Sequence, residues 1–302
     1  MRTTDADDGV TVAFDLLDGS GPPLLLAHAT GFCGSTWRPV AHHLAGRYRT
    51  WALDFRGHGR SGRPTDGRFD WAGTGLDVLA VLDAVDAAGE GPAAGATWVG
   101  AGHSMGGAAL LRAELARPGT FAALWLFEPV VFPPSVADAA GADAGEGDGD
   151  GTDGNHLARG AERRRAVFAS REAARENYAS KPPMSAFHPD ALDGYLDGGL
   201  RTLDDGSVAL RCAPADEAQV YRMGARHDTW TRVGEVACPV TVVAGDPDAP
   251  GPGAVAAELA ARLPLGRLES HPELSHFGPM EAPAAVADSI AVSVGGPTIA
   301  SP

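Results

Sequence analysis

Short apolar runs alternate with helix-compatible stretches along most of this chain. Runs that are typical of buried strands cover residues 24–28, 48–54, 97–101, 123–127, 240–244 and 267–271. Residues 70–88 carry apolar side chains at helical spacing. Strands that alternate with helices predict an α/β fold, with a mostly parallel, doubly wound sheet covered by helices on both faces. We expect Val10–Phe14 to form an edge strand of this sheet.

The alternation stops after the run at 123–127. An acidic, glycine-rich tract covers residues 138–155, and a charged helix is expected at about 157–178. The tract has too few apolar residues to pack, so we expect a mobile loop there. Residues 203–208 indicate a turn between two short extended pieces.

This interruption predicts two domains. Residues 1–132 and 233–302 are expected to form the core, and residues 133–232 an inserted, largely helical cap. Ligands of mostly parallel sheets gather at the carboxyl ends of the strands. We therefore expect the cap to lie over those ends.

Composition narrows the class of protein. The 302 residues are 44% hydrophobic, as is ordinary for a globular protein. The formal net charge of −15 argues against nucleic acid and anionic membranes as partners. The chain has no apolar run long enough to span a membrane, and its N-terminus does not resemble a signal peptide, so we expect a cytoplasmic location. The oligomeric state stays open, a homo-oligomer included.

Cysteine spacing adds no metal or redox chemistry. Cys33, Cys212 and Cys238 are an odd number and lie far apart in the sequence. We interpret them as buried or incidental thiols, and we expect neither a metal nor an organic cofactor.

The candidate nucleophile is Ser104, in the stretch Gly102-His103-Ser104-Met105-Gly106-Gly107. An apolar run precedes this stretch and a helix-compatible run follows it. In that strand–turn–helix setting, Gly-x-Ser-x-Gly is typical of a nucleophile elbow. In a chain with 40 glycines the pattern alone arises by chance in about one such chain in four. The interpretation therefore depends on the residues that would work with the serine.

A nucleophilic serine needs a base and a carboxylate that orients the base. His276 follows the last expected strand and is the candidate base for Ser104. Asp248 follows the run at 240–244 and is the preferred acid, since the order Ser, Asp, His fits an elbow on this kind of sheet. Glu128 is the main alternative acid, and Asp246 competes with Asp248.

An oxyanion hole requires two backbone N–H groups that point to one position. Met105, directly after the nucleophile, is expected to supply the first. The loop His28–Phe32 is expected to supply the second through the N–H of Phe32, because Gly31 permits a close backbone approach. His28 is expected to brace this loop rather than to react.

Together these motifs make the chain resemble a capped α/β-hydrolase fold protein. The matching residues are 28–32, 54–61, 102–107, Asp248, and His276 with Glu281 and Pro283. The resemblance implies a serine hydrolase that forms an acyl-enzyme intermediate on a small-molecule substrate: an ester, lactone or thioester. It disfavours epoxide opening and halide displacement, because relatives with those activities carry an aspartate at the elbow.

Other functions use similar residues. Carbon–carbon bond hydrolysis, aminopeptidase activity on a small peptide and perhydrolysis remain alternatives with the same three residues. A protein of this fold that binds a ligand with little turnover is the alternative outside enzymes.

Overall fold

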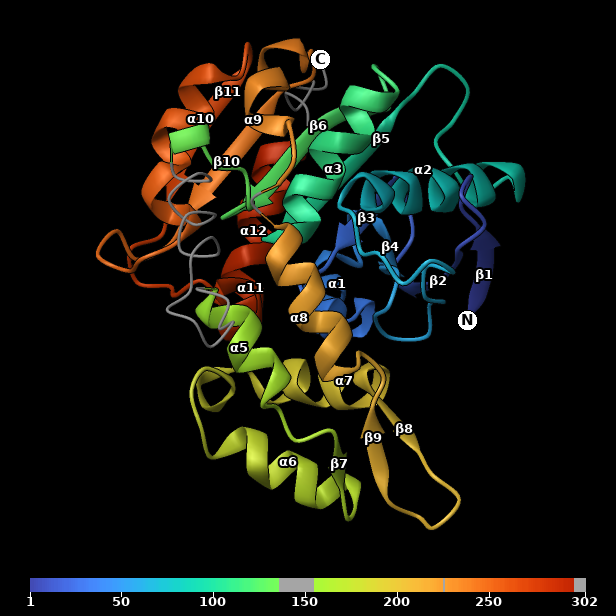
Figure 1. Ribbon diagram of the computed structural model, residues 1–302. Coiled ribbons are helices and arrows are strands. Elements are labelled where there is room, and N and C mark those ends of the chain that lie inside the picture. The colour runs from blue at the N-terminus through green and yellow to red at the C-terminus, as the bar shows by residue number, and fades with distance from the viewer. Residues whose placement is uncertain (136–154, 225, 296–302) are drawn as a thin grey trace.

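The computed structural model describes residues 1–135, 155–224 and 226–295. Within that part of the chain, one sheet has the strand order β1-β2-β4-β3-β5-β6-β10-β11 (Figure 1). Its strands are β1 (Arg2–Asp5), β2 (Thr11–Asp18), β3 (Pro23–Ala27), β4 (Arg49–Asp54), β5 (Trp98–His103), β6 (Phe121–Phe127), β10 (Val240–Ala244) and β11 (Gly266–Ser270). From β4 to β11 all neighbours are parallel. The predicted α/β fold with a mostly parallel sheet is confirmed.

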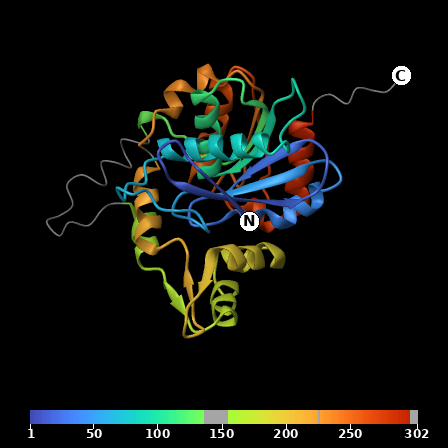
Figure 2. The same cartoon turned by 90° about the vertical axis from the view of Figure 1, so that its right-hand side faces the viewer.

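Helices cover both faces of the sheet (Figure 2). Those of one face are α2 (Ala72–Ala87), α3 (Met105–Ala116) and α10 (Ala256–Arg262), and those of the other are α1 (Arg38–Leu44) and α12 (Pro283–Val294). Successive side chains of a strand point to opposite faces. Leu25 and Ala27 of β3 accordingly join the apolar cluster under α2 and α3, whereas Leu24 and Leu26 join the cluster under α1 and α12. This two-sided burial explains the unbroken apolar run.

The N-terminal edge of the sheet differs from the expectation. β2 pairs with both β1 and β4, so Thr11–Phe14 of the expected edge strand belong to an interior strand, and Val10 lies just before it. The edge strand is β1, which consists of polar residues that are mostly exposed. Its pairing with β2 uses backbone groups, so β1 carries no hydrophobic alternation by which the sequence could reveal it.

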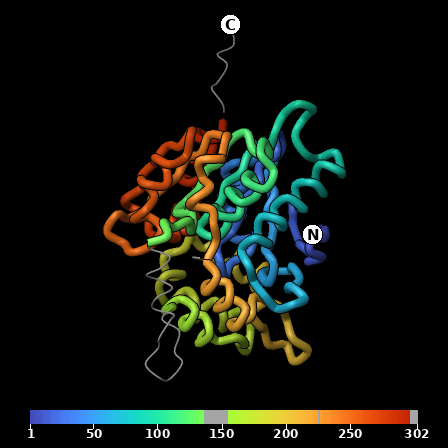
Figure 3. Tube along the Cα trace, turned by 45° about the horizontal axis from the view of Figure 1, so that its top comes forward, coloured from blue at the N-terminus to red at the C-terminus, as the bar shows by residue number. Residues whose placement is uncertain are grey.

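The elements between β6 and β10 mostly lie to one side of the core (Figures 1 and 3). They are α5 (His156–Glu162), β7 (Val167–Phe168), α6 (Arg171–Ala179), η2 (Met184–Ala186), α7 (Pro189–Gly199), β8 (Leu200–Thr202), β9 (Val208–Leu210), α8 (Pro214–Met223), α9 (Thr229–Arg232) and η3 (Val233–Glu235). β7, β9 and β8 form a small antiparallel sheet. The turn expected at 203–208 connects β8 to β9. We keep the name cap for this segment, and its boundaries stay a prediction.

The prediction of a single helix at about 157–178 is wrong. The structure has two helices there, α5 and α6, with β7 between them. The side chain of Ser170 starts α6 by accepting a hydrogen bond from the N–H of Ala173 at 3.2 Å. Of the loop expected at 138–155, only Asn155 lies within the described residues.

Cap helix α7 rests on the short helix η1 (Gly34–Trp37) of the core. The hydroxyl of Ser35 donates to the carbonyl oxygen of Gly194 at 2.7 Å. A Cβ atom at Gly194 would lie 2.2 Å from the carbonyl oxygen of Ser35, so only glycine allows this approach. The remaining short helices are η4 (Pro252–Val255) and α11 (Gly278–Glu281). Among the described helices none has both the length and the apolar character needed to cross a bilayer.

Candidate active site

Ser104 lies in a strained turn between β5 and α3. Its φ of 55° and ψ of −116° are values that residues other than glycine rarely adopt. The turn is tightly packed, since a Cβ atom at Gly106 would lie 2.2 Å from the carbonyl oxygen of Ala27. The N–H of Ser104 donates to the carbonyl oxygen of Phe127 at 2.9 Å, which ties the turn to β6. The serine thus sits at the carboxyl end of the sheet, beside the N-terminus of α3.

Glu128 and His276 form the central polar pair of the site. Nδ1 of His276 lies 2.6 Å from Oε2 of Glu128, whose side chain is 5% exposed. The other carboxylate oxygen, Oε1, accepts a hydrogen bond from the N–H of Gly245 at 2.9 Å. Glu128 has a φ of 42° and directly follows β6. The carboxylate is therefore fixed on both oxygens and directed at the imidazole.

Asp248, the preferred acid from the sequence, is not brought to His276. Asp248 is exposed, and its N–H donates to Oδ1 of Asp246 at 2.9 Å in a turn after β10. The N–H of Gly245, at the start of the same loop, is held by Glu128. The alternative acid from the sequence, Glu128, occupies the position beside the imidazole.

His276 and Ser104 are connected through His103. Nε2 of His103 lies 2.7 Å from the carbonyl oxygen of His276, and the two rings are 4.9 Å apart between centroids. Burial lowers the pKa of His103 well below its ordinary value, so its ring is neutral and donates through Nε2–H. Within the described residues, the Ser104 hydroxyl and the His276 ring do not form a hydrogen bond. Such contacts are often long without substrate and tighten when it binds.

The loop that carries His276 has a second anchor. The backbone N–H of Ser275 donates to Oε2 of Glu281 at 3.0 Å, and the hydroxyl of Ser275 donates to Oε1. Glu281 was part of the motif in the sequence. The structure gives it a role in holding the backbone next to the histidine.

The loop at 28–32, which the sequence predicts to supply an oxyanion donor, has two of its N–H groups bonded within the protein. We refer to it as the oxyanion loop. The N–H of Phe32 donates to the carbonyl oxygen of Ala29 at 3.2 Å, and the N–H of Gly31 donates to Nε2 of His58 at 3.0 Å. In the described part of the chain the N–H groups of Thr30 and Met105 have no protein acceptor. The hydroxyl of Thr30 lies 3.4 Å from Sδ of Met105, so these two residues are neighbours.

Two buried histidines hold this loop in place. His28 accepts at Nε2 from the N–H of Phe55 at 3.0 Å, and His58 reaches back to Gly31. In each ring Nδ1–H donates to a backbone carbonyl oxygen, of Ala29 and Arg56 respectively. Burial lowers the pKa of His28 to about 4, and burial together with His28 lowers the pKa of His58 to about 3. Both rings are neutral acceptors. The sequence predicted a bracing role for His28 but no such role for His58.

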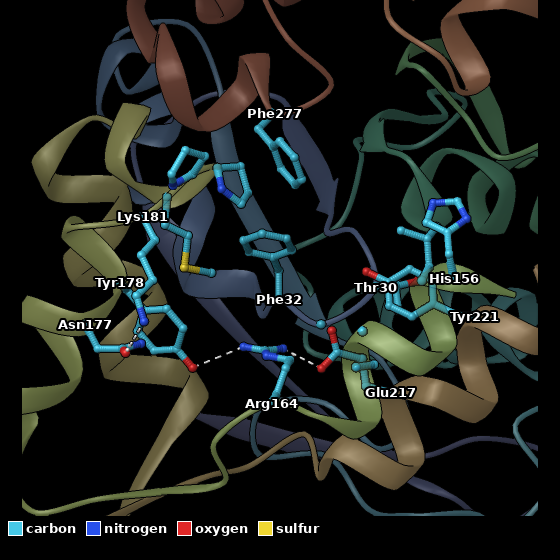
Figure 4. Close-up of a pocket in the computed structure, with 17 residues that line it drawn as sticks. Thr30, Phe32, His156, Arg164, Asn177, Tyr178, Lys181, Glu217, Tyr221 and Phe277 are labelled. Carbon is cyan, nitrogen blue, oxygen red and sulfur yellow. Dashed lines mark hydrogen bonds and ion pairs between the residues drawn. The ribbon is translucent and has the colours of Figure 1, made fainter.

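A cavity of about 360 Å³ opens between the oxyanion loop and the cap (Figure 4). Thr30, Gly31 and Phe32 line one part of it, and Phe277, next to His276, lines another. Arg164 of the cap lies between Tyr178 and Glu217 in this cavity (Figure 4). Neither Ser104 nor His276 lines the cavity, but Phe277 directly follows His276, and Thr30 lies 3.4 Å from Sδ of Met105, the residue after Ser104. Sequence reasoning did not single out Arg164.

Metal-ligand clusters are absent from the part of the chain that the structure describes: it contains no group of three histidine, cysteine or acidic side chains arranged to hold an ion. Cys33, Cys212 and Cys238 are free, buried thiols. Burial raises the pKa of the Cys33 and Cys238 thiols to about 12, which keeps them protonated.

Comparison with known proteins agrees with this architecture. The structure of E-2-(acetamidomethylene)succinate hydrolase aligns with a TM-score of 0.75 and 20% identity, over 97% of this chain and 99% of that one. The peroxisomal alpha-beta-hydrolase Lpx1 of Saccharomyces cerevisiae aligns with a TM-score of 0.73 and 19% identity, over 99% of this chain and 86% of that one. At such identities the likeness shows the fold alone.

Sequence comparison reaches a closer but shorter match. Lipase LipV of Mycobacterium tuberculosis is 36% identical over 113 residues, which are 37% of this chain and 39% of the lipase. This chain thus spans well under half the length of that relative. The family model described as the alpha/beta hydrolase family matches residues 24–289. Because that match covers most of the chain and the fold agrees with it, the chain belongs to the alpha/beta hydrolase family.

Proposed function

We propose that this protein is a serine hydrolase that cleaves a small ester, lactone or thioester through an acyl-enzyme intermediate on Ser104. The observation that carries this proposal is the 2.6 Å contact between His276 and Glu128 beside the strained turn at Ser104. A base oriented by a buried carboxylate next to a serine at an elbow is the arrangement that nucleophilic acyl transfer needs.

In the first half of the reaction, Nε2 of His276 removes the proton from the Ser104 hydroxyl as Oγ attacks the carbonyl carbon. The imidazole then carries a positive charge. Glu128 stabilises that charge and keeps the proton on Nδ1. His276 returns its proton to the departing alcohol or thiol, which leaves the acyl group on Ser104. Water, activated by the same histidine, releases the acid in the second half.

The acid in this proposal is Glu128 and not Asp248. Glu128 contacts the imidazole, is nearly buried, and has its second oxygen held by Gly245. Asp248 is exposed, and its side chain makes no contact with the imidazole among the described hydrogen bonds and ion pairs.

The oxyanion hole in this proposal consists of the N–H groups of Met105 and Thr30. Met105 is the first residue of α3, so its N–H has no partner within the helix, and the helix dipole favours negative charge there. Thr30 replaces Phe32 as the second donor, because the N–H groups of Gly31 and Phe32 are already bonded within the protein.

The nucleophile can be tested with a fluorophosphonate probe and mass mapping of the adduct. We expect labelling at Ser104 that disappears in Ser104→Ala. The matched control is Ser180→Ala, which removes an exposed serine of the cap and should leave labelling unchanged. Absence of labelling in the folded wild-type protein, or an adduct at another serine, would contradict the proposal.

A further inference from the structure

Four polar side chains of the cap meet at the cavity beside the proposed site. The guanidinium of Arg164 is paired with the carboxylate of Glu217 and donates to the hydroxyls of Tyr195 at 2.5 Å and Tyr178 at 3.2 Å. Glu217 and Tyr195 are only 4% and 1% exposed. Contacts on three sides hold the guanidinium in one orientation, so a ligand would meet a preorganised donor.

This cluster lies directly over the oxyanion loop. A Cβ atom at Gly31 would be 2.4 Å from Oε1 of Glu217 and 3.4 Å from Nη1 of Arg164. Gly31 has a φ of 80°, so glycine is favoured there on backbone grounds as well. A group that reaches past Gly31 into the cavity therefore comes close to the ion pair of Glu217 and Arg164, with the carboxylate the nearer of the two.

The charge around the cavity is opposite to that of the whole protein. The chain has a formal net charge of −15 and a single lysine, Lys181. Lys181 and Arg164 line the cavity together with one carboxylate, that of Glu217. An adjoining cavity shares Arg164 and Lys181 and adds Arg163 and Arg165, and its lining contains no carboxylate. The linings of the two cavities thus contain four cations and one carboxylate.

A buried ion pair costs desolvation free energy, and an apolar pair of similar volume would often stabilise a fold as well. Arg164 and Glu217 line the cavity, whereas a cavity that binds an alkyl acyl chain would be better lined by apolar side chains alone. The presence of the ion pair, with the additional cations at Lys181, Arg163 and Arg165, favours a ligand that brings its own negative charge.

We propose that the substrate carries a carboxylate on its acyl part, which Arg164 and Lys181 bind while the ester or lactone carbonyl lies at Ser104. This inference rests on the proposed function and names its substrate class. Water adds to the acyl carbon and the alcohol leaves with a proton, so an acyclic substrate of this class yields a dicarboxylate.

The test compares two substrates of equal acyl length, 4-nitrophenyl hydrogen glutarate and 4-nitrophenyl valerate, with spontaneous hydrolysis subtracted. We expect the wild-type protein to favour the anionic ester in kcat/KM by roughly tenfold or more, as a charge-assisted hydrogen bond would give. Lys181→Gln, at an exposed position, should reduce that ratio several-fold. High salt should reduce the ratio in the wild-type protein in the same direction.

A double variant removes the buried pair without leaving an unpaired charge. Arg164→Gln with Glu217→Gln should abolish the preference while Ser104 still reacts with fluorophosphonate. The matched control is Arg175→Gln, which removes an arginine of α6 that pairs with Asp193 and lines neither cavity, and should keep the ratio.

The outcomes separate the two proposals. Equal or faster hydrolysis of the neutral ester by the wild-type protein would overturn the carboxylate inference and leave the serine hydrolase standing. Failure of Ser104 to react with the probe would overturn both.

Discussion

Nδ1 of His276 is 2.6 Å from Oε2 of Glu128, although Glu128 lies 148 residues earlier in the chain. The carboxylate comes from the end of β6 and the imidazole from the loop after β11. Both residues therefore lie at the carboxyl ends of the parallel strands.

This contact predicts which acid substitution abolishes activity. Glu128→Gln should lower kcat by roughly three to four orders of magnitude, because the amide cannot stabilise the imidazolium or fix its tautomer. Asp248→Asn should change kcat by less than about twofold, since its side chain is exposed and away from the imidazole. Steady-state kinetics on a 4-nitrophenyl ester, with circular dichroism to verify folding, measures both. The opposite ranking would return the role of the acid to Asp248.

His103 is predicted to position His276. His103→Phe leaves the carbonyl oxygen of His276 without its 2.7 Å donor, so the loop should shift. We expect kcat to fall by about ten- to a hundredfold, which corresponds to one unsatisfied buried acceptor. His103→Gln places an N–H near the position of Nε2 and should recover most of the loss. If KM rises while kcat stays constant in His103→Phe, the residue affects substrate binding and not the histidine.

His28 and His58 contribute to the pH dependence of stability. Their folded-state pKa values of about 4 and about 3 lie below the ordinary value of 6.5. As pH falls below 6.5, these histidines take up protons in the unfolded chain but stay neutral in the folded protein, so the stability present above pH 6.5 is progressively lost. The loss ends where the folded protein also binds the proton, at about pH 4 for His28 and about pH 3 for His58. Each histidine should cost about 2 kcal/mol between pH 6.5 and pH 5.

Urea denaturation at pH 7.5 and pH 5 measures how much His58 contributes to this loss of stability. His58→Gln keeps an acceptor for the N–H of Gly31 but does not titrate. Its free energy of unfolding should decline by about 2 kcal/mol less than that of the wild-type protein over this range. Equal declines in the two proteins would mean that His58 is not a buried neutral acceptor.

Attachment of the cap depends on Gly194. Gly194→Ala places a methyl group against the carbonyl oxygen of Ser35, so α7 must move away from η1, and we expect about 1–3 kcal/mol of destabilisation. Gly160→Ala is the matched control in helix α5, where a Cβ atom meets nothing within 4 Å. That change should stabilise the protein by up to about 1 kcal/mol through helix propensity. Thermal melting of both variants measures these changes. Equal shifts of the melting temperature in the two variants would contradict the close approach of Gly194 to Ser35.

Local patterns in the sequence predicted much of the fold and part of the site. Buried strands such as Leu24–Ala27 appear as apolar runs, and the turn at Ser104 appears in its flanking glycines, because both depend on neighbours in the chain. β1 and the break between α5 and α6 escaped detection, since backbone pairing and a local cap produce no hydrophobic period.

The sequence by itself thus determined the strand–helix order, the elbow at Ser104 and the candidate histidine. Only the tertiary structure shows that Glu128, and not Asp248, contacts the imidazole, because both residues follow strands whose carboxyl ends lie together and only packing determines which carboxylate faces the ring. It also decided which N–H groups of the oxyanion loop are already bonded, since His58, a partner far along the chain, occupies one of them. Hydrogen bonds between distant segments have no period or spacing in the sequence, so those choices required the fold.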